Sequence, residues 1–219
     1  MDRRRLQVLR LGRVAYTEAL ALQARWVTER RAGEIEDRLA LLEHPAVITL
    51  GTSSHDDHVL LSRDELDRRG IEIEAVGRGG DVTFHGPGQL VGYPILDLKP
   101  DRQDLHRYLR DLEEVLVRAL GSLGVAARRV PGLTGVWADG GKVAAIGVRV
   151  SSGWITSHGF ALNVGIDLSG FEAIVPCGIS DRSVTSIERE LKRDVDRDRV
   201  EQAVLHAFAE VFDRDIVEA

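Results

Sequence analysis

The sequence predicts an α+β fold, in which hairpin-linked strands outnumber strand–helix–strand crossovers. In the second half of the chain, strand-like runs follow one another closely, separated by glycine-containing turns at 140–141 and 151–153. Clear amphipathic helical segments are also present, of which 104–120 is the strongest. No Pro/Ser-rich linker divides the 219 residues, so we expect a single domain over residues 1–219.

Strand and helix signals are mixed in the first half. Residues 16–31 carry apolar side chains at helical spacing, which predicts a helix. Ser62 and Glu65 form a capping box for a short helix that ends at Gly70. The strands expected in this half are 6–11, 38–43, 46–50, 71–76 and 90–98.

The second half contains three expected helices and three expected strands. Thr185 and Glu188 form a capping box at the start of one of the helices. The expected helices are 104–120, 185–192 and 198–212, and the expected strands are 135–138, 142–150 and 154–164.

Composition narrows the class of protein. The formal net charge is −6, which argues against a dedicated nucleic-acid binder. The basic runs, such as Arg128–Arg129, are typical of solvated helix ends and turns. The alternative is that one of them forms a binding site for an acidic partner. A single cysteine excludes an intramolecular disulfide, no apolar run approaches a membrane span, and Arg10 and Arg13 interrupt any signal-peptide core. We therefore expect a cytoplasmic protein.

The segment Arg78–Gln89, with sequence RGGDVTFHGPGQ, contains several residues that can bind a ligand or transfer a proton. Its glycines allow positive φ angles and close approach of backbone N–H groups to a ligand, while His85 can transfer a proton. The dinucleotide fingerprint fails because Val82 stands where the third glycine belongs, and no phosphate-loop Gly-Lys-Ser/Thr occurs. Taken alone, the segment is equally compatible with a turn between two strands that carries an incidental histidine.

Cys177 is the candidate nucleophile. Its neighbours Pro176 and Gly178 favour a loop, and the loop leads toward a capped helix start, where positive potential favours a thiolate. The alternative is that it is simply a small buried hydrophobe.

Three side chains are candidate partners for the thiol: Lys142, His85 and His158. Lys142 stands at the start of an apolar strand, although most lysines after a Gly-Gly turn face solvent. His158 is equally compatible with a hydrogen-bonded histidine at a strand bend.

The remaining histidines give weaker signals. His55 and His58 flank two aspartates, but such a run is more typical of a solvated loop, and we expect no metal. We interpret the other three as structural or surface residues: His44, His106 and His206.

With these segments in view, the chain resembles the lipoyl(octanoyl) transferase family from about Leu6 to the C-terminal helix. The Arg78–Gln89 signature and the Pro176-Cys-Gly-Ile179 motif are highly specific together. The other matching pieces are Leu41–Pro45, Thr49–Gly51, Tyr93, Gly135–Trp137, Lys142, Ala145–Gly147, His158–Asn163 and Val184–Ser186.

The resemblance implies a mixed β-sheet flanked by helices, like the catalytic domains of biotin protein ligases and lipoate ligases. It implies that Cys177 carries the acyl group as a thioester and that Lys142 activates the thiol and acts as acid/base. The implied acyl-site residues are Arg78, Gly79, Gly80, Asp81, Val82, Thr83, Phe84, His85, Ala145, Ile146, Gly147, Gly159, Phe160 and Ala161.

The resemblance also implies the reaction and its partners. An octanoyl group moves from octanoyl-acyl carrier protein to a lysine of lipoyl domains, in 2-oxoacid dehydrogenases and the glycine cleavage H protein. Transfer from a thioester to an amine needs no ATP, no metal and no other cofactor, and we expect no nucleic-acid or membrane partner. Small and apolar residues in the implied site predict a narrow slot with an optimum near eight carbons.

Three rival hypotheses remain, and each has its own signature. A ligase of the same fold would depend on ATP and need no nucleophilic cysteine. A cysteine hydrolase would release free acid, and a non-enzymatic acyl-binding domain would form no covalent adduct.

Overall fold

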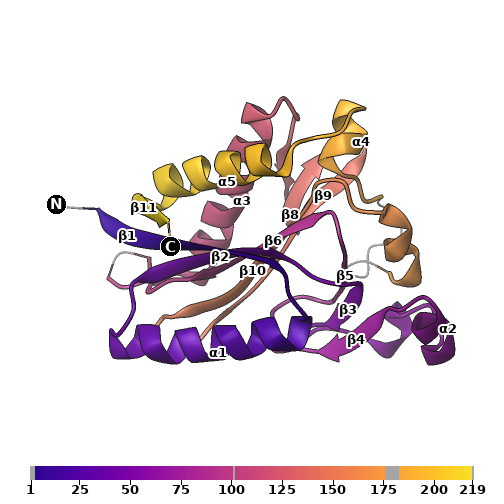
Figure 1. Cartoon of the computed structure of the whole chain (residues 1–219), viewed down its shortest axis with the longest axis horizontal. Helices are drawn as coiled ribbons and strands as arrows, with labels where there is room; N and C mark the ends of the chain where they lie inside the picture. The colour runs from indigo at the N-terminus through magenta and orange to yellow at the C-terminus, as the bar shows by residue number, and fades with distance from the viewer. Residues whose placement is uncertain (1–2, 101, 176–182, 219) are drawn as a thin grey trace.

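The computed structural model describes residues 3–100, 102–175 and 183–218. Two β-sheets and the helices around them form the fold (Figure 1). The strands are β1 Arg4–Arg13, β2 Asp37–Glu43, β3 Val47–Leu50, β4 Glu72–Ala75, β5 Val82–His85, β6 Gln89–Ile95, β7 Arg128–Val130, β8 Leu133–Ala138, β9 Gly141–Val150, β10 Thr156–Asn163 and β11 Arg214–Glu218. The helices are α1 Tyr16–Ala32, α2 Arg63–Arg68, α3 Leu105–Ser122, α4 Ile187–Leu191 and α5 Arg197–Phe212, with 3₁₀ turns at Asp56–His58 and Leu168–Ala173.

The larger sheet has eight strands in the order β11-β1-β2-β6-β10-β9-β8-β7. β1 pairs in parallel with β11 and with β2, and all the other pairs of this sheet are antiparallel. The smaller sheet has the order β4-β3-β5. The predicted α+β class and the predicted mixed sheet are confirmed.

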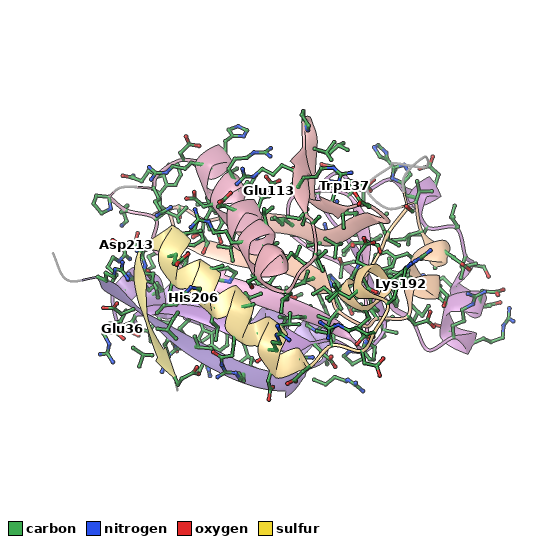
Figure 2. All side chains as sticks on the ribbon, turned by 90° about the horizontal axis from the view of Figure 1, so that it is seen from above. Glu36, Glu113, Trp137, Lys192, His206 and Asp213 are labelled. Carbon is green, nitrogen blue, oxygen red and sulfur yellow. The ribbon has the colours of Figure 1, made fainter. Side chains whose placement is uncertain are left out.

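Helices cover both faces of the larger sheet. α1 lies on one face, and α3 and α5 lie together on the other (Figure 1; Figure 2). α3 begins at Asp104, whose carboxylate accepts from the N–H of Arg107 at 3.1 Å, and its Tyr108, Leu112 and Leu116 are fully buried. Their spacing of four residues places them on one helix face, which packs against the sheet together with α5. No helix in the described part of the chain is long and apolar enough to cross a membrane.

The elements differ from the sequence-based expectation in four places. The glycine-rich segment contains a strand, β5, that pairs with β3, whereas we expected only turns there. The charged strands β7 and β11 were not expected. The α4 helix is capped by Ser186, whose hydroxyl accepts from the N–H of Arg189 at 3.3 Å, and not by Thr185 as predicted. The Thr185 hydroxyl instead donates to the Glu190 carboxylate at 2.6 Å.

Candidate functional site

A cavity lies between the two sheets. Its floor is formed by three neighbouring strands of the larger sheet, β9, β10 and β6, and its cover by β5 and the segment that precedes it. The start of α1 contributes Tyr16. The lining residues are Tyr16, Arg78, Gly80, Asp81, Val82, Thr83, His85, Val91, Tyr93, Lys142, Ala145, Ile146, Gly147, His158, Gly159, Phe160 and Ala161.

Small residues make room for this cavity. The β9–β10 register sets Ala145 opposite Ala161 and Gly147 opposite Gly159, two cross-strand pairs of small residues on one face of the sheet. Gly147 also permits the close approach of the covering loop, because a Cβ atom there would lie 2.8 Å from the carbonyl oxygen of Gly79. The sheet is therefore hollowed where the sequence predicted an acyl slot.

The covering loop is held down by a buried arginine. Arg78 donates from Nη2 to the carbonyl and hydroxyl oxygens of Thr49, at 2.8 and 2.7 Å, and from Nε to the same hydroxyl at 3.1 Å. Gly80 follows with φ of 90°, which a residue with a side chain adopts only with strain. Arg78 thus fixes the loop to β3 and places its positive charge at the cavity wall.

Lys142 stands at the start of β9, and its backbone is held on both sides. Its N–H donates to the carbonyl of Ser183 at 2.9 Å, and its carbonyl accepts from the N–H of Thr185 at 3.0 Å. The side chain is buried, with Nζ 5.6 Å from the centroid of the Trp137 ring. Although most lysines after a Gly-Gly turn face solvent, this one is built into the wall of the cavity.

A wider pocket adjoins the cavity, and we call it the mouth pocket. The two spaces share Lys142, Ile146, Gly147, Gly80 and Asp81. The outer rim of the mouth pocket is formed by Ser53, His55, His58, Leu105, Leu109, Gly132, Leu133, Thr134 and Val148, with Gly79. Lys142 thus lies at the junction between a narrow inner space and a broad outer one.

His85 is neutral at physiological pH. Burial, and after it the neighbouring His44, lowers the pKa of His85 to about 3. Its Nδ1 lies 2.7 Å from Oε1 of Gln89; an amide oxygen only accepts, so Nδ1 carries the proton and Nε2 keeps its lone pair. Gln89 Nε2 in turn donates to Asn163 Oδ1 at 2.9 Å, and Asn163 Nδ2 donates to the carbonyl of Thr185 at 2.9 Å. This chain of hydrogen bonds ends next to the backbone of Lys142.

An aromatic group closes the side of the cavity away from Lys142, and the sequence analysis did not predict it. The ring of Tyr16 stacks on that of His85 at 5.8 Å, and the Tyr93 hydroxyl donates to Nε2 of His44 at 2.7 Å. Nδ1 of His44 donates to the carbonyl of Val14 at 2.8 Å, which fixes this tautomer. The predicted structural role of His44 is confirmed. Tyr16 opens a helix and carries no pattern in the sequence that marks it as a site residue.

Of the predicted site residues that the structure describes, all line the cavity except Phe84 and Gly79. The Phe84 ring lies on the other side of β5, 5.5 Å from the Phe171 ring, because alternate side chains of a strand face opposite ways. Cys177 lies outside the described residues. Gly79 lines the mouth pocket, and His158 lies at the inner end of the cavity.

The histidine pair at 55 and 58 lies at the rim of the mouth pocket. The two rings are 5.3 Å apart, and Nδ1 of His58 lies 2.6 Å from Oδ2 of Asp81. Among the described residues, no three His, Cys, Asp or Glu side chains are grouped as metal ligands.

Comparison with known proteins identifies the class of fold first. A putative lipoate protein ligase from T. acidophilum, solved with bound lipoic acid, superposes with a TM-score of 0.74 at 18% identity, covering all of this chain and 89% of that one. A biotin protein ligase from Aquifex aeolicus superposes with a TM-score of 0.57 at 16% identity, covering 95% and 70% of the two chains. The fold is therefore that of the catalytic domains of lipoate and biotin protein ligases.

Sequence similarity is more specific. A family model described as the lipoyl protein ligase A/B catalytic domain matches residues 15–209. An octanoyltransferase of Rubrobacter xylanophilus is 55% identical over 208 residues, which cover 94% of this chain and 93% of that protein. The chain belongs to the lipoyl protein ligase A/B catalytic domain family and, within it, groups with the octanoyltransferases. The resemblance stated from the sequence motifs is confirmed.

Proposed function

We propose that the chain transfers an octanoyl group from octanoyl-acyl carrier protein to a lysine of lipoyl domains, through a thioester on Cys177 with Lys142 as acid/base. The observation that carries this proposal is a narrow cavity floored by Ala145, Gly147, Gly159 and Ala161, with a buried lysine at its opening. Its lining of small and apolar residues suits an alkyl chain, and octanoyl is the group for which the relatives are named.

The proposed first half-reaction is a transthioesterification. The Cys177 thiolate attacks the carbonyl carbon of the donor thioester, and backbone N–H groups of the glycine-rich cover stabilise the oxyanion. The bond from the acyl carbon to the donor's sulfur breaks, and the carrier thiol leaves with a proton supplied by Lys142. The acyl group is then held on Cys177, with its alkyl chain in the cavity.

The second half-reaction is aminolysis of this thioester. The acceptor lysine attacks as a neutral amine, so a base must take its proton, and neutral Lys142 is that base. The C–N bond forms, the C–S bond breaks, and the cysteine leaves as thiolate. The neutral His85 keeps one lone pair and can assist the proton transfer.

The described residues that flank 176–182 support the pairing of Cys177 with Lys142. On one side the N–H of Val175 donates to the carbonyl of His58 at 2.9 Å, and on the other the carbonyl of Ser183 accepts from Lys142. Both His58 and Lys142 line the mouth pocket. The chain therefore leaves and re-enters the described structure at the opening of the cavity.

The proposed acceptors are the lipoyl domains of 2-oxoacid dehydrogenases and the glycine cleavage H protein, and the proposed compartment is the cytoplasm. The basic runs expected to dock an acidic carrier are largely engaged within the chain. Arg128 pairs with Asp139 at 3.0 Å, and Arg129 with Glu114 at 2.6 Å. The open and partly apolar mouth pocket is the better candidate for receiving the carrier's thioester arm and the acceptor lysine.

The test is the intact mass of the protein after incubation with octanoyl-acyl carrier protein. We expect one octanoyl group that hydroxylamine removes, and loss of both the adduct and turnover in Cys177→Ser. Because the positive charge of Lys142 favours a thiolate, iodoacetamide labelling of Lys142→Ala should move to higher pH. Normal turnover by Cys177→Ser refutes covalent catalysis by this residue, and a requirement for ATP refutes the transferase in favour of a ligase.

A further inference from the structure

A second pocket lies behind the inner end of the cavity. It opens between α1 and the β9–β10 turn, and we call it the rear pocket. Its walls combine apolar side chains of α1 with two arginines. The lining residues are Leu20, Gln23, Ala24, Val27, Arg31, Gly77, Arg149, Ser151, Ser157 and His158.

His158 separates the rear pocket from the cavity. Across the described parts of the chain, it is the one residue that lines both spaces. It is 6% exposed. The centroids of its ring and of the Tyr93 ring are 6.4 Å apart, and the two rings are nearly perpendicular. Its backbone N–H donates to Oε1 of Gln23 on α1 at 2.7 Å, which fixes the strand at this point.

The ring presents an uncharged wall to an alkyl chain. Burial, and after it the charges of Arg78 and Arg149, lowers the pKa of His158 to about 4, so the ring is neutral at pH 7. The residue has φ of 55°, a left-handed conformation that is uncommon for residues with a side chain and costs glycine nothing. A strained, neutral and buried side chain therefore stands where the two spaces meet.

Distances along the sheet give the length of chain that this wall permits. Val148 is the cross-strand partner of His158 and stands six residues after Lys142 on β9. A strand advances about 3.3 Å per residue, so this span is about 20 Å. An extended acyl chain advances about 1.25 Å per carbon, given C–C bonds of about 1.5 Å. Eight carbons need about 10 Å, whereas sixteen need about 20 Å and leave no room for the two side chains at the ends.

We propose that His158 is a specificity-determining residue, which closes the inner end of the acyl cavity and sets the upper limit of acyl chain length. The rear pocket is the space that a longer chain enters when the ring is absent. This inference rests on the proposed function, because it assigns the alkyl chain to the cavity that opens beside Lys142.

The test is the donor chain-length profile of His158→Gly. Glycine suits the left-handed backbone, so this change removes the wall and relieves strain. Each additional buried methylene raises affinity about fourfold, so we expect the optimum to move to twelve carbons or beyond. The ratio of kcat/KM for hexadecanoyl-acyl carrier protein to that for the octanoyl donor should rise at least about tenfold. His158→Asn, which also tolerates the left-handed conformation, serves as a second and smaller side chain.

Two further variants control the experiment. Ser157→Gly changes a residue of the rear pocket alone and should keep the wild-type profile. Ala24→Phe, added to His158→Gly, refills the rear pocket from an exposed position of α1 and should abolish the new use of long donors.

The outcomes separate the two proposals. If the wild type transfers octanoyl groups and a folded His158→Gly keeps the wild-type chain-length ratio, the wall is not His158 and the inference is wrong. If the wild type forms no octanoyl adduct and transfers none, the proposed function itself fails.

Discussion

At the scale of single residues, Lys142 owes its position to a glycine that sits beside it. Gly135 on β8 has φ of 118°, and a Cβ atom there would lie 2.5 Å from Cε of Lys142. The N–H of Gly135 donates at 3.0 Å to a carboxylate oxygen of the fully buried Glu113, labelled on α3 in Figure 2. The helix therefore holds the strand in the one conformation that leaves space for the lysine.

We predict that Gly135→Ala lowers turnover by displacing Lys142. The added methyl group would also lie 2.6 Å from the carbonyl oxygen of Ala144, so both the lysine side chain and β9 must shift. A misplacement of about 1 Å in a catalytic group can cost roughly 100-fold in rate. The measurement is kcat for octanoyl transfer, alongside the free energy of unfolding.

Gly70→Ala is the matched control. Gly70 also has positive φ, of 65°, but a Cβ atom there meets nothing within 4 Å. Gly70→Ala should lose about 1–2 kcal/mol of stability from backbone strain, and Gly135→Ala more, because its Cβ also meets the Ala144 carbonyl. Equal kcat values for the two would show that the contact with Lys142 does not matter.

At the scale of elements, the pairing of β9 with β10 shapes the slot. Ala161 pairs with Ala145 of β9 on one side and with Val91 of β6 on the other. Across these three strands the side chains that form the floor of the cavity grow from the methyl groups of the two alanines to the isopropyl group of the valine. A larger side chain at the centre of the row narrows the slot partway along its length.

We predict that Ala161→Val shortens the preferred acyl chain. Forcing extra methyl groups into a packed space costs about 1–3 kcal/mol, so kcat/KM for the octanoyl donor should fall about tenfold or more. Butanoyl transfer, which needs less of the slot, should fall much less, and it serves as the control within the same variant. A uniform loss across a donor series from four to ten carbons would contradict this picture.

The sequence predicts long, regular elements well and short or charged ones poorly. The β9–β10 hairpin was expected from two runs of β-forming residues around 151–153, and the structure has both strands. β5 was missed because its four residues stand inside a glycine-rich segment, and β11 because three of its five residues are charged. The helix cap at Ser186 was displaced by one residue because Thr185 offers the same hydroxyl chemistry.

The site residues that could be predicted from the sequence also differ in kind from those that could not. Residues in specific motifs, such as Arg78, Gly147 and Gly159, come together at the cavity as expected. Tyr16 and Val91 were missed because they sit in an ordinary helix start and an ordinary strand, and only tertiary packing brings them to the cavity. Phe84 was wrongly grouped with them in space, since strand alternation turns its ring away.

At the scale of the whole molecule, three buried histidines tie stability to pH. Burial lowers the pKa of His44, that of His85 to about 3 and that of His158 to about 4. In the unfolded chain each regains a pKa near 6.5 and binds a proton as the pH falls through that value. The unfolded state therefore holds more protons below pH 6.5, and the free energy of unfolding falls as the pH drops toward the folded-state values.

We predict that wild type loses stability steeply between pH 7.5 and 5. A histidine that stays neutral in the fold contributes about 2 kcal/mol to this loss, from 1.5 pH units at about 1.4 kcal/mol each. His85→Asn should lose about 2 kcal/mol less over the same interval, whatever its stability at pH 7.5. The measurement is denaturant unfolding at both pH values.

His206 provides the control for this prediction. Its ring points outward from α5 and is 79% exposed (Figure 2). His206→Asn should reproduce the wild-type difference between the two pH values. If His85→Asn does so as well, His85 does not contribute to the pH dependence.

The junction at Lys142 has a consequence for the order of events in a cycle. The cavity and the mouth pocket share Lys142, Gly80, Asp81, Ile146 and Gly147. On the proposed function, the carrier that delivers the acyl group and the domain that accepts it both need this same opening. They must therefore take turns, so the spent carrier departs before the acceptor docks, and an excess of either protein competes with the other. The acyl group therefore stays on the enzyme after the carrier has left and before the acceptor docks.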